Sequence, residues 1–157
     1  MLLGGMSACG GDGGEHTPTQ SLERPRPLAS ERFAGPHYSF ASEARPPIRR
    51  ATVQGRRLEG GRRWLVVVRV RIANRLGTPL RLGLLSAAVQ ARGGRRYEPI
   101  LADGRDTTKP AFARSMVPAR GWLDAELVYR LPRRAIAGSQ LAVRDPARRR
   151  SFELRLF

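Results

Sequence analysis

Residues 64–73 read WLVVVRVRIA, and this run decides the fold class of the chain. In its second half, Val68, Val70 and Ile72 alternate with two arginines, which puts apolar and charged side chains on opposite sides of a β-strand. A helix would need an apolar period near 3.6 residues, and β-branched valines suit a pleated strand better. Asn74 follows the run and is predicted to end the strand.

Shorter apolar segments, separated by Gly- and Pro-rich turns, continue this pattern along the chain. Residues 122–130 alternate again, with Asp124 and Glu126 predicted to point outward. The other predicted strands are residues 51–58, 84–91, 95–100, 140–144 and 151–157. Seven or eight short strands in about 110 residues are typical of an antiparallel, immunoglobulin-like β-sandwich, which we predict for residues 48–157.

The start of the chain is of another kind and resembles a bacterial lipoprotein signal. Met6-Ser7-Ala8-Cys9 is similar to a lipobox, in which an apolar and two small residues precede the cysteine that receives a diacylglycerol. Only eight residues precede Cys9 and none is basic, whereas a secretory signal needs a basic segment and an apolar run. We therefore expect residues 1–9 to be the remnant of a signal that starts upstream. The alternative is a glycine-rich soluble N-terminus with a chance cysteine.

Residues 10–47 have the composition of a flexible linker. They begin with glycines and then contain six prolines among scattered polar and charged residues, which cannot bury an apolar surface. Residues 37–40 alternate briefly and allow one short first strand. His37 is interpreted as a turn or edge residue, because no second histidine stands near it.

The basic charge belongs to the later part of the chain. Of the 29 bases, 28 are arginine and one is Lys109. Residues 48–157 hold 25 bases and eight acids, whereas residues 1–47 hold four arginines and five acids. Codon usage in a GC-rich genome is one explanation of this excess, and attraction to an anionic partner is the other.

A count of chain reversals predicts that many arginines gather at one end of the sandwich. If every turn reverses the chain, the turns at residues 59–61, 92–94, 118–121 and 145–149 fall at the same end. The predicted anion-binding residues at those turns are Arg56, Arg57, Arg62, Arg63, Arg92, Arg95, Arg96, Arg148, Arg149 and Arg150, with Arg120 and Arg144 beside them. Guanidinium groups placed in this way can hold phosphate groups bidentately.

Motifs for catalysis are missing from the sequence. Gly10–Gly14 lacks the lysine and the setting of a phosphate loop, and no Gly-x-Ser-x-Gly elbow occurs. Asp103 and Asp106 share a loop with the bases Arg105 and Lys109 and are interpreted as solvated. Trp64 and Trp122 are interpreted as core or edge packing rather than a carbohydrate platform. We predict a non-catalytic protein with no cofactor and no metal site.

Three segments of the predicted domain together resemble a known family. They are LVVVRVRIAN (residues 65–74), GGRRYEP (residues 93–99) and VPARGWLDAELVYRLP (residues 117–132). In this order and spacing they are similar to the secreted immunoglobulin-like domain of unknown function found in many bacterial lipoproteins, a family sometimes labelled telomeric-repeat-binding-factor-like. The resemblance implies an extracytoplasmic β-sandwich and no catalytic residues.

Two functions follow as hypotheses. In the first, the chain is a lipid-anchored, extracytoplasmic binding module whose partner is an envelope protein, a wall polymer or an anionic lipid surface. In the second, it is a soluble basic protein that binds nucleic acid. The second is disfavoured, because the arginines stand beside Gly and Pro and only Tyr97 offers an aromatic ring for base stacking.

Overall fold

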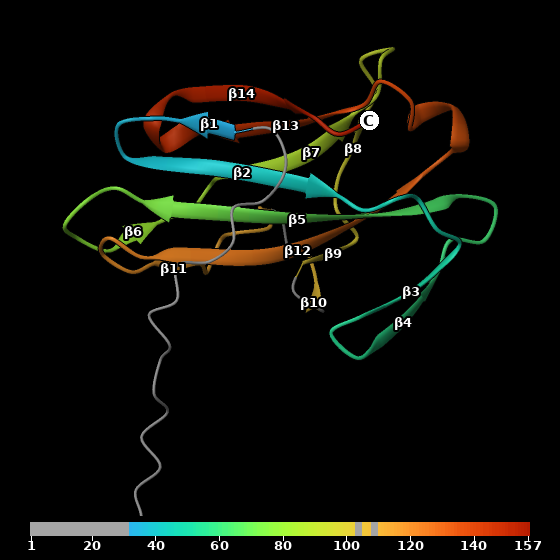
Figure 1. Cartoon of the computed structure of the whole chain (residues 1–157), viewed down its shortest axis with the longest axis horizontal. Helices are drawn as coiled ribbons and strands as arrows, with labels where there is room; N and C mark the ends of the chain where they lie inside the picture. The colour runs from blue at the N-terminus through green and yellow to red at the C-terminus, as the bar shows by residue number, and fades with distance from the viewer. Residues whose placement is uncertain (1–31, 103–104, 108–109) are drawn as a thin grey trace, which may run out of the picture.

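Two long antiparallel strands form the centre of the structure, which is a computed structural model that describes residues 32–102, 105–107 and 110–157. Strand β5 (Trp64–Asn74) pairs with β12 (Trp122–Leu131) along its length, from Trp122 opposite Ala73 to Leu131 opposite Trp64. The strand predicted from the alternating run is thus confirmed. The two ends of the β5–β12 pair are called the Trp64 end and the Asn74 end of the sandwich. They lie at the right and at the left of Figure 1, respectively.

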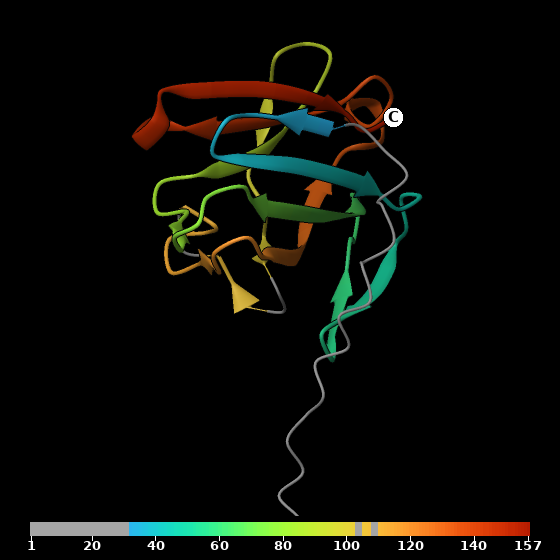
Figure 2. The ribbon, with the colours of Figure 1, turned by 60° about the vertical axis from the view of Figure 1, so that its left-hand side comes forward.

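The strands form two facing sheets and two small ribbons (Figures 1 and 2). The first sheet has the order β1-β2-β5-β12-β9-β10, in which the added strands are β1 (Arg32–Ala34), β2 (Tyr38–Ala44), β9 (Leu101–Ala102) and β10 (Arg105–Asp106). The second sheet has the order β14-β13-β7-β8, made of β14 (Arg150–Arg155), β13 (Gln140–Asp145), β7 (Ser86–Gln90) and β8 (Arg96–Tyr97). The ribbons are β6 (Leu80–Arg81) with β11 (Met116–Val117), and β3 (Arg50–Val53) with β4 (Arg56–Glu59).

This strand order is the immunoglobulin arrangement. Strands β2, β5, β12 and β9 correspond to A, B, E and D of one sheet, and β7, β13 and β14 to C, F and G of the other. The described residues contain no α-helix, only the 3₁₀ turns η1 (Arg133–Ala135) and η2 (Pro146–Arg148). The predicted all-β, immunoglobulin-like sandwich is confirmed.

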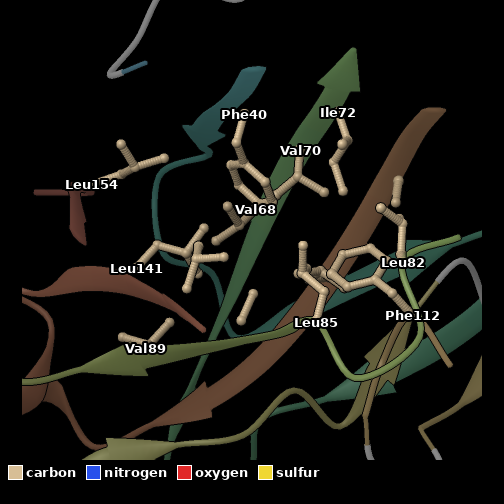
Figure 3. Close-up of a cluster of buried hydrophobic side chains, with 14 of the residues drawn as sticks. Phe40, Val68, Val70, Ile72, Leu82, Leu85, Val89, Phe112, Leu141 and Leu154 are labelled. Carbon is tan, nitrogen blue, oxygen red and sulfur yellow. The ribbon is translucent and has the colours of Figure 1, made fainter. Parts of the chain in front are cut away.

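The main core lies between the sheets (Figure 3). Phe40, Val68, Val70 and Ile72 of the first sheet pack toward Leu141 of the second, and all are buried. Loop residues close the space at the Asn74 end, among them Leu82, Leu85 and Phe112. Apolar and charged residues therefore alternate in β5 and β12 because one side of each strand is buried in this core and the other side is not.

The hairpin β3–β4 explains why the run at residues 65–68 does not alternate. It packs against the outer side of the first sheet, where Val53 forms a second buried cluster with Leu65, Val67 and Val128. Strand β5 is thus covered on both sides near the Trp64 end and on one side only beyond residue 68. The single strand predicted for residues 51–58 is wrong, because Gln54 and Gly55 take φ of 49° and 76° and turn the chain back.

The sandwich begins earlier than the predicted boundary at residue 48. Residues 32–34 and 38–44 were assigned to the linker, yet they form β1 and β2, and β2 pairs with β5 over seven residues. Tyr38 and Phe40 are almost fully buried. The alternation is weak in the sequence because the next inward position is Ser42, a polar side chain that the fold buries. Residues 1–31, which include Cys9 and the part of the predicted linker before β1, lie outside the described residues.

Polar side chains fix the loops to this frame. Asn74 is buried and donates from its amide to the carbonyl oxygens of Thr78 and Pro118, at 2.7 and 3.0 Å, while its own oxygen accepts the N–H of Leu76. The Tyr129 hydroxyl crosses the core and donates to the carbonyl oxygen of Ala87 at 3.0 Å. Asn74 thus ends β5, as predicted, by holding two loops at the Asn74 end.

Candidate anion-binding site

The ten predicted anion-binding arginines do not lie at one end of the sandwich. Arg62, Arg63, Arg92, Arg95 and Arg96 belong to the Trp64 end, because their turns adjoin Trp64 and Gln90. Arg148, Arg149 and Arg150 belong to the Asn74 end, where Arg148 lies over the Tyr38 ring and donates to the carbonyl oxygen of Arg81. The prediction of a single arginine-rich end is wrong.

The count of reversals failed between residues 95 and 117. The sequence suggested a strand at 95–100, a loop and then a return of the chain. Two crossings of the sandwich would bring the turn at residues 118–121 back to the same end as the turn at residues 92–94. In the structure this segment passes only once from the Trp64 end to the Asn74 end, in the short strands β8, β9, β10 and β11. Each later turn is therefore displaced to the opposite end, including Arg120, which donates its backbone N–H to Leu76.

Two of the predicted residues lie on the hairpin instead. Arg56 and Arg57 follow its turn, away from its base at the Trp64 end. Arg56 forms an ion pair with Asp106 at 3.0 Å, which joins the hairpin to the edge strand β10. Both residues are thus separated from the two ends of the sandwich.

At the Asn74 end, one arginine has a structural role. Asp145 is completely buried and accepts both the backbone N–H and the guanidinium of Arg148, the latter at 2.9 Å. This pair caps η2 and closes the turn before β14, in which Arg149 adopts a left-handed conformation. Arg148 is therefore already occupied by an internal carboxylate.

Both ends of the sandwich carry exposed arginines without an ion pair among the described residues, and one such group lies at the Trp64 end. The group, named here the arginine rim, comprises Arg49, Arg62, Arg63, Arg92, Arg95, Arg133 and Arg134, and every member is exposed. Among the described residues, none of them forms an ion pair. Glu59, beside this end, is bound to Arg50 at 3.7 Å. The rim therefore presents uncompensated positive charge.

Two acids on the outer side of the first sheet pair with nearby arginines of the same side. On the outer side of the first sheet, Asp124 forms a bidentate pair with Arg71 at 2.5 and 2.6 Å. This hydrogen bond, rather than the partial burial that opposes it, raises the pKa of Arg71. Glu126 in the same row pairs with Arg45 at 2.6 Å and approaches Arg69 at 4.0 Å. Alternation places these charges side by side on neighbouring strands, so they compensate one another.

A shallow recess of about 450 Å³ opens within the arginine rim. It is lined by Pro47, Trp64, Arg133, Ile136, Ala137 and Phe157. The guanidinium carbon of Arg49 lies 4.3 Å from the centre of the Trp64 ring, a cation–π contact. The indole N–H of Trp64 is buried and has no hydrogen-bond partner among the described residues. The recess thus combines an apolar lining with nearby positive charge.

Sequence reasoning missed three members of this site and misjudged a fourth. Arg133 and Arg134 follow β12, in a turn that the count of reversals put at the opposite end from the predicted site, while Arg49 was not singled out at all. Trp64, interpreted as packing, lines the recess. The Pro-Arg-Arg at residues 132–134 was a visible signal, but its location depended on the correct count of strand traverses.

The remaining predicted features are dispersed. Asp106 pairs with Arg56, whereas Asp103 and Lys109 lie outside the described residues. His37 is exposed in the turn between β1 and β2, as predicted, and Trp122 is 44% exposed on the first sheet. In the described part of the chain, no group of three potential metal ligands occurs, and no helix has the length and apolarity to span a membrane.

The strand order and the layered core define the chain as an all-β sandwich protein. Its fold is similar to that of an uncharacterized β-sandwich protein from Clostridium difficile 630, with a TM-score of 0.50 and 9% sequence identity over 82% of this chain and 91% of that chain. At this identity, the likeness concerns the fold alone. No family model and no curated protein matches the chain.

Proposed function

We propose that this chain is an extracytoplasmic, lipid-anchored, non-catalytic binding module that contacts an anionic partner through the arginine rim. The single observation that carries the proposal is the rim itself, seven exposed arginines at one end without an ion pair among the described residues. The lipobox-like Met6-Ser7-Ala8-Cys9 and the resemblance to immunoglobulin-like lipoprotein domains support the location.

Binding to inorganic polyphosphate, a flexible polyanion, tests the site. The variant Arg62→Glu/Arg133→Glu/Arg134→Glu should weaken binding at least tenfold and flatten the dependence of the binding constant on salt concentration. The matched control is Arg120→Glu/Arg149→Glu/Arg150→Glu at the Asn74 end, which changes the net charge equally and should weaken binding less than threefold. Equal losses would show that binding follows net charge alone and would overturn the proposed site.

The anchor has a separate test. The reading frame upstream of Met1 should encode a basic segment and an apolar run, and expression from that start should yield a chain that incorporates labelled fatty acid. Cys9→Ser should abolish the incorporation. A stop codon close upstream, without such a run, would contradict the anchor. Double-stranded DNA that binds the rim more tightly than polyphosphate does would then favour the nucleic-acid alternative.

A further inference from the structure

We propose that the Trp64 end docks on the surface of a bilayer that contains anionic phospholipid. This inference rests on the proposed function and names the partner of its binding site. The arginine rim would contact headgroup phosphates, and the recess beside Trp64 would receive the apolar part of the interface. Three observations carry it: the length of the chain between Cys9 and the domain, the chemistry of the recess, and the positive charge of the rim beside that recess.

The described chain begins at Arg32, on a strand that runs toward the Asn74 end. Strand β1 is antiparallel to β2, with Arg32 opposite Ala41 and Ala34 opposite Ser39. Because β2 runs from the Asn74 end toward the Trp64 end, β1 runs the other way. Twenty-two residues separate Cys9 from Arg32, so an anchored domain stays within roughly 80 Å of the bilayer even at full extension. Anchoring therefore keeps the whole sandwich, both ends included, within reach of the membrane.

The recess has the chemistry of an interfacial site. Five of its six lining residues are apolar or aromatic, and the sixth is Arg133. The ring of Trp64 lines the recess, and the guanidinium carbon of Arg49 lies 4.3 Å from its centre. Tryptophan is favoured at membrane interfaces because its ring is apolar and its N–H is polar. A soluble phosphate would satisfy the arginines but would leave the apolar lining in water.

The rim supplies the electrostatic part. A basic residue near an anionic membrane surface contributes about 1 kcal/mol of attraction, and this adds to the effect of a lipid anchor. Among the described residues, members of the rim have no carboxylate to release before they meet a headgroup, and the same holds for Arg120, Arg149 and Arg150 at the other end. The Asn74 end also has exposed apolar residues, namely Leu84, Met116 and Trp122. It is therefore the natural internal control.

The two tryptophans allow a direct test, since each end has one. The full chain carrying Cys9→Ser, which cannot be acylated, is mixed with vesicles of phosphatidylcholine alone or with 30% phosphatidylglycerol, some with bromine on the acyl chains. In the Trp122→Phe background, Trp64 fluorescence should be quenched by brominated anionic vesicles. In the Trp64→Phe background, Trp122 should not be quenched. The reverse pattern would place the bilayer at the Asn74 end and overturn the inference.

Co-sedimentation with the same vesicles measures how strongly each variant binds. Arg133→Glu/Arg134→Glu should reduce binding to anionic vesicles at least tenfold, and Arg149→Glu/Arg150→Glu less than threefold. If the chain with an unmodified rim binds polyphosphate but does not bind anionic vesicles, this inference is overturned and the proposed function still stands. Loss of rim-dependent binding to both probes would overturn both.

Discussion

At the Asn74 end, the side chain of Tyr38 brings a phenol into the core. Its hydroxyl is buried and makes no hydrogen bond of good geometry, although the carboxylate of Asp145 lies near it. Burial, and then the charge of Asp145, raise the pKa of Tyr38 well above its usual value of 10.0. The unfolded chain therefore loses this proton before the folded one does, so the contribution of Tyr38 to stability is complete below about pH 10 and is lost at higher pH.

Tyr38→Phe should have a free energy of unfolding at pH 8 equal to that of the wild type or up to about 1 kcal/mol higher, because the buried hydroxyl is removed. Between pH 9.5 and 11, its free energy of unfolding should fall less steeply than that of the wild type. A residual slope will come from Tyr129, whose pKa burial also raises. Urea unfolding followed by tryptophan fluorescence measures both values. Tyr97→Phe is the control, and a wild-type slope in Tyr38→Phe would contradict the prediction.

At the scale of elements, the hairpin β3–β4 protects the outer side of β5. Its turn requires a left-handed conformation at Gly55, with φ of 76° and no atom near the position of a Cβ. Gly55→Ala should therefore cost about 1 kcal/mol of stability through backbone strain alone. Gly77→Ala is the matched control, since Gly77 is also open but does not have positive φ, and its cost should stay within about 0.5 kcal/mol. The denaturant midpoints of the two variants measure these costs. Equal losses of stability would exclude backbone strain as the cause.

At the scale of the whole molecule, the first strands close the sandwich. The ring of Phe33 on β1 stacks on that of Phe152 on β14, with centroids 3.9 Å apart, so the edges of the two sheets meet. Chain 32–157 should therefore unfold cooperatively with the same free energy as the full chain. Chain 48–157 should fail to fold, because losing Tyr38 and Phe40 costs several kcal/mol each against a total of about 5–15. Near-ultraviolet circular dichroism distinguishes the two, and a cooperative transition in chain 48–157 would contradict the boundary.

The fold class could be read from the sequence because period-two alternation is a local property. The strand at residues 64–74, the strand at 122–131 and the pair at the C-terminus each show it within a few residues. Strands β1 and β2 could not be read with the same ease, because β1 has only three residues and Ser42 occupies an inward position of β2. The type of turn at Gln54 and Gly55 was also visible only as a Gln-Gly pair inside an apparent strand.

The sequence by itself determined the all-β class, the alternation of the central strands, the basic excess and the lipobox-like position of Cys9. Tertiary structure alone decided which arginines share an end, because that depends on how often the chain crosses the sandwich between residues 95 and 117. It also decided that Asp124 and Glu126 neutralise the outer side of the first sheet and leave the arginine rim without partners. Strand pairing and chain reversals are non-local, so local patterns of hydrophobicity do not specify them.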